Sequence, residues 1–284
     1  MPKDVSMAPM TAPHHLVDAL GVAHLPAPGA RIVSLVPSIT ELLCDLGLAA
    51  QLVGRTGFCI HPAQAVAAIP KVGGTKDVNI GKIRQLAPTH LVVNIDENEK
   101  PTVDALAEFV PHIVVTHPLA PGDNLALARL MGGIFGVDAA AEAWCAAFEA
   151  EYARLRAAPP GPARTVLYCI WQDPWMSVSA DTYIARMLAE LGWRVPALPA
   201  EFDQRARYPR FAWSDTLVQD LDAVLLSTEP YRFTEAHADA LEKQLGIPVF
   251  LVDGEMMSWY GSRALAGLRY LQALRATVEG RAAD

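Results

Sequence analysis

The sequence is short of the features that mark several large classes of protein. Its 284 residues carry 23 Lys and Arg against 31 Asp and Glu, a formal charge of -8, with no basic stripe. Phosphate binding needs clustered cations that release counterions, so we expect no nucleic-acid partner. Four dispersed cysteines without a CxxC pair argue against a disulfide framework. The apolar runs are strand-sized and fall short of the ~18 residues of a membrane span, so no membrane insertion is expected.

Catalytic motifs are also missing. The chain has no G-x-S-x-G elbow and no H-E-x-x-H pair, the local signatures of serine hydrolases and zinc proteases. The single Asp-x-Glu at Asp253 and Glu255 is too weak to indicate a hydrolase. The sequence therefore favours a binding protein over an enzyme, and a hydrolase working in a cleft is the less favoured alternative.

Residues 1–30 lack the apolar h-region of a secretory signal, because prolines interrupt them throughout. We interpret them as an N-terminal extension. As written, the sequence predicts a cytoplasmic protein, or a periplasmic one if an upstream start or signal was removed.

What is present is an alternation of strand-length apolar runs with helix-period segments. The runs lie at residues 32–36, 91–93, 113–115, 166–170, 224–226 and 249–252. Such alternation predicts an α/β fold with parallel sheets covered by helices. Residues 83–93 resemble 217–226, and 110–115 resemble 246–251, which predicts two similar lobes.

A long helix is expected between the lobes. Asp138 can cap it, and a proline cluster at 159–162 ends it. One apolar stripe advances by three and four through Ala141, Trp144, Cys145, Phe148, Tyr152 and Leu155. About 20 residues give a rod of ~30 Å. We predict a lobe over 31–122, a helical linker over 123–162 and a lobe over 163–284. The ligand cleft is expected between the two lobes, and the protein is expected to be a monomer.

The richest candidate for a site is the run 253–263, which follows an apolar strand-like segment. Large apolar side chains in a loop contact water unless something covers them, and we expect a ligand to do so. The candidate ligand contacts in this run are Glu255, Met256, Trp259 and Tyr260.

Loops that follow other predicted strands in the first half of the chain contain further candidate site residues. Cys59 and His61 would point to one face of an extended chain and could ligate a metal or a metal-bearing cofactor. Alternatively, Cys59 packs as a hydrophobe and His61 stabilises the turn before Pro62. Residues 73–77, with Thr75 and Lys76, could bind an anion or form a plain tight turn. Residues 94–99 read as a solvated loop or as a polar lip of the cleft.

In the second half, aromatic residues lie at or just beyond the ends of predicted strands. Trp171 and Trp175 follow one strand, Tyr208 lies in a short polar segment, and Glu229 and Tyr231 follow another strand. Tryptophan in a loop is favoured where a flat apolar body must be covered. Each of these residues is as easily structural as functional, and their shared position at strand ends favours function.

Residues 33–41, 72–80 and 86–92 carry a family likeness that extends over about 31–274. The chain resembles the class III, or helical-backbone, substrate-binding proteins of ABC importers, in the branch that includes cobalamin binders. The resemblance implies two lobes that hinge little and a corrinoid, haem or other metal chelate held between them, with no cofactor required. The resemblance also implies that the permease of an ABC transporter is a partner.

By position, the family's ligand contacts fall near Phe58, Thr75, Asn94, Tyr208 and Met256. Only two of these are aromatic here, and Trp171, Trp175, Trp259 and Tyr260 could substitute for the others. The family's docking acids fall near Gly81 and near Ser214 or Asp215, so the first acid is missing. The leading hypothesis is binding of a corrinoid or related metal chelate by an importer protein or a cytosolic relative, and the alternative is a metal-ion or metallocofactor handling protein.

Overall fold

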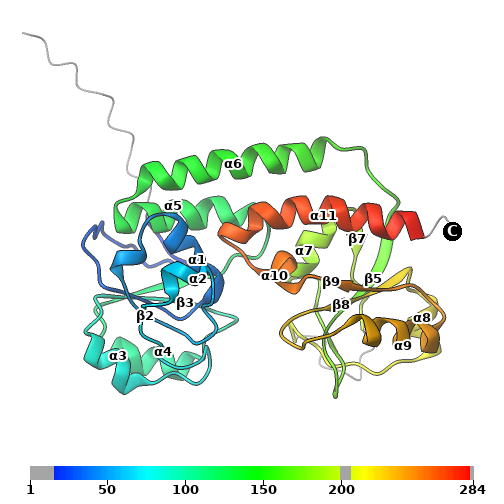
Figure 1. The fold of residues 1–284 in the computed structure, drawn as a ribbon, viewed down its shortest axis with the longest axis horizontal. Helices are drawn as coiled ribbons and strands as arrows, with labels where there is room; N and C mark the ends of the chain where they lie inside the picture. The colour runs from blue at the N-terminus through cyan, green and yellow to red at the C-terminus, as the bar shows by residue number, and fades with distance from the viewer. Residues whose placement is uncertain (1–15, 199–205, 282–284) are drawn as a thin grey trace, which may run out of the picture.

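The computed structural model describes residues 16–198 and 206–281. Figure 1 shows two lobes side by side beneath a layer of long helices. Residues 1–15 of the predicted N-terminal extension lie outside the described residues. The rest of that extension runs along the first lobe, where the backbone N–H of Ala19 donates to the carbonyl of Val115 at 2.9 Å.

The first lobe is built on a parallel sheet of order β2-β1-β3-β4. Its strands are β1 (Ile32–Ser34), β2 (Leu52–Arg55), β3 (His90–Asn94) and β4 (His112–Thr116). Its helical segments are α1 (Pro37–Asp45), the 3-10 turn η1 (Ala49–Gln51), α2 (Ala63–Val66), α3 (Ile80–Leu86) and α4 (Lys100–Ala107). Every residue of β3 is buried, as expected of a parallel strand covered on both faces.

The second lobe has a sheet of order β6-β5-β8-β9, with β7 paired to β5. Its strands are β5 (Arg164–Trp171), β6 (Met176–Ser177), β7 (Trp193–Arg194), β8 (Ala223–Ser227) and β9 (Val249–Val252). Its helices are α7 (Tyr183–Ala189), α8 (Asp215–Gln219), α9 (Glu235–Leu245), α10 (Gly254–Ser258) and α11 (Ser262–Arg281). Only the two-residue β6 runs antiparallel among the described pairings of this sheet.

The two lobes are joined by α5 (Asp123–Phe135) and α6 (Asp138–Ala157). In Figure 1, α6 runs across the top of both lobes, with α5 and α11 beneath it. One buried apolar cluster contains Val92 of the first sheet, Phe148 of α6, Leu225 of the second sheet and Leu271 of α11. Each lobe also has a separate cluster on the other side of its sheet. The central helices and both sheets therefore share one core.

The structure confirms the two parallel-sheet lobes and the long helix predicted from the sequence. Two local predictions were wrong. Asp138 does not cap α6, because the N-cap is Val137 and Asp138 is the first helical residue. The run 253–263 is not a plain loop, because the Asp253 side chain accepts a hydrogen bond from the Met256 backbone at 3.2 Å and starts α10.

Within the described ranges, every helix is too short or too polar to cross a membrane.

Candidate functional site in the notch between the lobes

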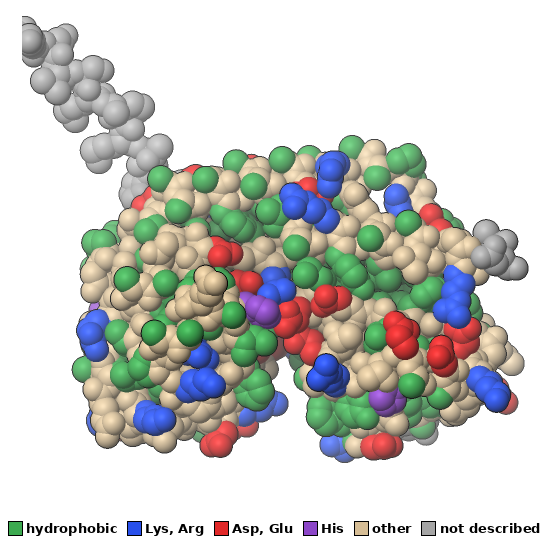
Figure 2. Space-filling model, in the orientation of Figure 1, with side chains coloured by type: hydrophobic (Ala, Val, Ile, Leu, Met, Phe, Trp, Pro, Cys, Tyr) green, Lys and Arg blue, Asp and Glu red, His purple; other side chains and the backbone are tan. Residues whose placement is uncertain are grey.

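The carboxyl ends of the strands in both sheets lead into loops that border the space between the lobes. In open α/β sheets, ligands collect at this edge. Figure 2 shows a notch that separates the lobes, with acidic, basic and histidine side chains gathered at its top. The loops after β2, β3, β5, β8 and β9 supply the candidate residues.

Exposed apolar side chains gather at this edge. Among described residues, the large apolar side chains that are most exposed outside the N-terminal segment are Phe58, Ile60, Ile95, Trp171 and Tyr208. Phe58 and Ile60 follow β2, Ile95 follows β3, and Trp171 ends β5. Phe58 is 63% exposed and Trp171 39% exposed. Exposed apolar side chains at the ligand edge of a sheet are typical of a binding site.

Charged groups from both lobes meet at the top of the notch. The Arg263 guanidinium lies 2.8 Å from the carboxylate of Glu41 on α1 and 2.9 Å from that of Glu255 on α10. His61, after β2, lies 3.4 Å from the same Glu255 carboxylate. The Trp259 ring packs edge-on to His61 at 5.7 Å and beneath Arg263 at 5.0 Å. Burial raises the pKa of Glu41, and Arg263 opposes that rise.

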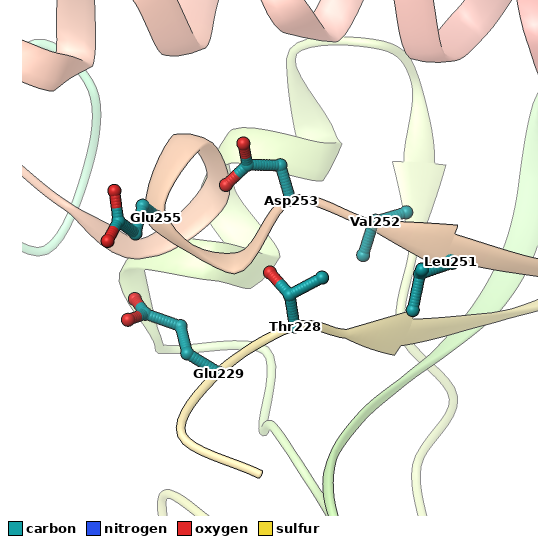
Figure 3. A pocket seen from close by; sticks show the side chains of 6 residues that line it. All are labelled: Thr228, Glu229, Leu251, Val252, Asp253 and Glu255. Atoms are coloured by element: carbon teal, nitrogen blue, oxygen red, sulfur yellow. The ribbon is translucent and has the colours of Figure 1, made fainter. Parts of the chain in front are cut away.

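A second acidic group lies below this network. Glu229 accepts hydrogen bonds from the Ser258 hydroxyl at 3.0 Å and the Trp259 indole N–H at 2.7 Å. Burial raises the pKa of the Glu229 carboxyl, and the nearby Glu255 and Asp253 raise it further. These three acids line a pocket of about 380 Å³ at the ends of β8 and β9, together with Thr228. Figure 3 shows that the Glu229 and Glu255 side chains extend to the same side of this pocket.

The polar loop after β3 also contacts the second lobe. Asp96 lies 2.9 Å from Arg207 and 3.4 Å from His117. The Tyr260 hydroxyl donates to the carboxylate of Glu97. Burial raises the pKa of Glu97 to about 7, and the hydrogen bond from Tyr260 opposes that rise. Residues 94–99 thus form a polar lip that contacts both lobes, one of the two readings of the sequence.

Cys59 and His61 have separate partners in the structure. The Cys59 thiol is buried and lies 3.1 Å from the hydroxyls of both Thr40 and Thr56, whereas His61 faces Glu255. Burial raises the pKa of the Cys59 thiol, which disfavours the thiolate. Among the described residues, no group of three or more His, Cys, Asp and Glu side chains is arranged to hold a metal ion.

The remaining candidates in the second lobe divide between the notch and the core. Trp171 packs edge-on to Tyr231 at 5.4 Å, next to the notch. Trp175 instead stacks on Phe233 at 5.8 Å inside the cluster of the second lobe. Met256 is half-buried on α10, whereas its neighbour Met257 is fully buried.

In the first lobe, Thr75 and Lys76 lie in a tight turn closed by a hydrogen bond from the Gly74 N–H to the Asp77 carbonyl at 2.7 Å. Asn94 is buried and holds the lip, since its side-chain oxygen accepts from the Asp96 N–H at 2.8 Å.

Sequence reasoning did not single out Glu41, Ile60, Ile95 or Arg263 as individual site residues. Ile60 and Ile95 carried a usable signal, because each is a large apolar residue just beyond a strand. Glu41 carried none, since an acid on an amphipathic helix is usually solvated.

Two lobes of like topology, with their ligand edges facing across a notch and their spacing set by a shared helical layer, define a substrate-binding protein with a helical backbone. The chain belongs to the periplasmic binding protein family, whose model matches residues 32–243. Members of this family are the non-catalytic binding components of ABC importers, which confirms the prediction of a binding protein rather than an enzyme.

Several known proteins are similar to the chain over most of its length. A vitamin B12-binding protein of Pectobacterium carotovorum is 23% identical over 238 residues, which cover 83% of this chain and 84% of that relative. The periplasmic vitamin B12 binding protein BtuF of Vibrio cholerae superposes with a TM-score of 0.70 at 18% identity, covering 87% and 98% of the two chains. The periplasmic heme-binding protein RhuT of Roseiflexus sp. RS-1 gives 0.69 at 21% identity, covering 88% and 98%. The two structures show the fold.

Proposed function

We propose that this protein binds a corrinoid or a related metal chelate, such as haem, in the notch and presents it to an ABC importer in the periplasm. The observation that carries the proposal is the set of exposed apolar side chains contributed by both lobes to one edge. A tetrapyrrole ring offers a broad apolar face to such side chains. The relatives named for vitamin B12 and heme support the same ligand class.

The energetics suit this ligand. Covering apolar surface yields roughly 25 cal/mol per Å², and an aromatic contact adds about 0.5 to 1.5 kcal/mol. Phe58 in the first lobe and Trp171 in the second are the two most exposed aromatic rings among the described residues. The ring of a chelate held between the lobes would contact both.

The test is titration with cyanocobalamin and with haemin, followed by calorimetry and by quenching of tryptophan fluorescence. We expect saturable binding of at least one of them, weakened about tenfold by Trp171→Ala and by Phe58→Ala, since one aromatic contact corresponds to about 1.4 kcal/mol. Leu20→Ala is the matched control, because Leu20 is exposed and lies in the N-terminal segment. Neither heat nor a spectral change with either chelate would refute the proposal.

For transporter docking, we propose that the second lobe supplies the acid. Asp215 is exposed in the first turn of α8, whereas Ser214 is engaged as the N-cap and receives the Leu217 N–H at 3.2 Å. Gly81 is exposed on α3 and offers no carboxylate. The alternative of metal-ion handling through Cys59 and His61 is not favoured, because the two side chains have separate partners.

A further inference from the structure

The notch carries more carboxylates than cations. The acids along it are Glu41, Asp96, Glu97, Glu229, Asp253 and Glu255. The guanidinium groups that pair with them belong to Arg207 and Arg263. Because charges at a half-buried edge are only partly screened, this surplus acts on any charged ligand that enters.

Both arginines are already engaged with carboxylates of the protein. Arg263 pairs with Glu41 and Glu255, and its side chain is 16% exposed. Arg207 pairs with Asp96 at 2.9 Å and with Asp181 at 3.2 Å. A ligand carboxylate that took the paired N–H groups of either guanidinium would displace a protein carboxylate and leave that acid unpaired in a half-buried place. The Arg207 Nε is the exception, because it is buried without a hydrogen-bond partner among the described residues.

Two of the acidic side chains can accept further hydrogen bonds. For Glu229 and Asp253, the described residues provide hydrogen-bond donors but no salt-bridge partner. Together with Glu255 they line the pocket of about 380 Å³ that adjoins the notch (Figure 3). An amide N–H or an ammonium group entering this pocket would find acceptors, whereas a carboxylate would meet charges of its own sign.

Exposed cations also lie near the edge. Arg232 is exposed in the loop after β8 and directly follows Tyr231. Lys76 is in the tight turn beside Phe58, whose ring approaches Gly74 of the same turn. Its ammonium is a point charge on a flexible stem, which holds a carboxylate less firmly than a paired guanidinium does. The contribution of Lys76 to the binding of a ligand carboxylate can be measured with the substitution Lys76→Ala.

We propose that the notch selects a chelate whose periphery donates hydrogen bonds and carries no carboxylate, as an amide-bearing corrinoid does, over a dicarboxylate porphyrin such as haem. The proposal rests on the function proposed above and names the ligand class of the same site. The preference for an uncharged periphery has two causes. Carboxylates without cationic partners line the pocket at one wall of the notch, and the arginines at the other walls already pair with carboxylates of the protein.

The test compares three probes on the full chain by calorimetry at about pH 8, where free carboxyl groups are ionised. Aquocyanocobinamide carries a net positive charge, cyanocobalamin is neutral overall, and haemin bears two propionates. We expect the two corrinoids to bind at least about tenfold more tightly than haemin. Glu229→Gln should narrow that gap by improving haemin binding, and Glu108→Gln, at the C-terminal end of α4 and away from the ligand edge, should leave it unchanged.

The outcomes separate this proposal from the one on which it rests. Equal affinities, or tighter binding of haemin, would overturn the selection while leaving chelate binding in place. A gap that persists unchanged in Glu229→Gln would overturn the role of the acidic pocket, provided that the thermal midpoint shows the variant to be folded. A haemin affinity that falls in Lys76→Ala, with the corrinoid preference kept, would support the inference, because it assigns residual haemin binding to that lysine. Binding of none of the probes would refute the proposed function itself.

Discussion

At the residue scale, Cys59 shows how burial decides the role of a reactive side chain. Its position two residues before His61 is compatible with metal ligation, yet its thiol is surrounded by the hydroxyls of Thr40 and Thr56. Burial raises its pKa, so the thiolate that a metal would need is disfavoured.

We therefore expect Cys59→Ala to leave chelate affinity unchanged and to lower the free energy of unfolding by about 1 kcal/mol, through lost packing and lost hydrogen bonds. Urea unfolding and calorimetry measure the two quantities. A large fall in affinity in a variant that keeps its stability would show that the thiol acts on the ligand after all.

Glu97 has a strongly shifted pKa that lies near neutral pH. Burial raises its pKa from 4.5 to about 7 in the folded chain. A carboxyl whose pKa is higher when folded holds its proton more tightly in the native state, so the free energy of unfolding falls as pH rises between those two values. The loss is at most about 3 kcal/mol at 1.36 kcal/mol per pKa unit.

The measurement is urea unfolding of the protein and of Glu97→Gln at about pH 5 and about pH 8. We expect the variant to gain stability relative to the parent as pH rises, because the glutamine accepts the Tyr260 hydrogen bond without becoming charged. A stability difference that is the same at both pH values would contradict the assignment.

At the element scale, α10 positions the acidic wall of the notch and depends on a close approach to α11. A Cβ on Gly267 of α11 would lie 2.5 Å from the Met256 carbonyl oxygen. Because the obstacle is backbone, it cannot move aside without shifting α10, which carries Glu255.

Gly267→Ala should therefore lower the free energy of unfolding by roughly 1 to 3 kcal/mol, the usual range for overpacking, and should also weaken ligand binding. Gly280→Ala in the same helix is the control, since a Cβ there meets nothing within 4 Å. That control should be neutral or more stable by at most about 1 kcal/mol. Thermal unfolding and calorimetry test both, and equal behaviour of the two variants would contradict the role given to the α10–α11 contact.

The sequence was most informative for elements with a sustained period. The α6 stripe and the apolar runs of β3 and β8 could be predicted because burial on one or both faces leaves a pattern in the chain. The helix α10 could not, because it has five residues and owes its formation to the Asp253 cap and to α11. The pairing of Arg263 with Glu41 spans 222 residues and has no local signature. The site was therefore predicted as a set of loops, and its charge network was not.

At the scale of the whole molecule, the lobes are coupled on two levels. The apolar cluster that includes Phe148 and Leu271 runs through both lobes and the helical layer. Nearer the ligand edge, Arg207 pairs with Asp96 across the notch, and Arg263 pairs with Glu41. A hinge motion would have to strip apolar contacts from a close-packed core, which costs roughly 25 cal/mol per Å² exposed.

We therefore expect the lobes to keep their spacing when a ligand binds, in contrast to proteins that close around a ligand through flexible hinges. Small-angle X-ray scattering of the free protein and of the protein saturated with cyanocobalamin should give the same radius of gyration within error. Arg207→Ala, which removes the pair with Asp96 but leaves the shared core intact, should likewise scatter as the parent does. A marked contraction on binding would mean that the notch closes, and that the helical layer does not fix the distance between the lobes (Figure 1).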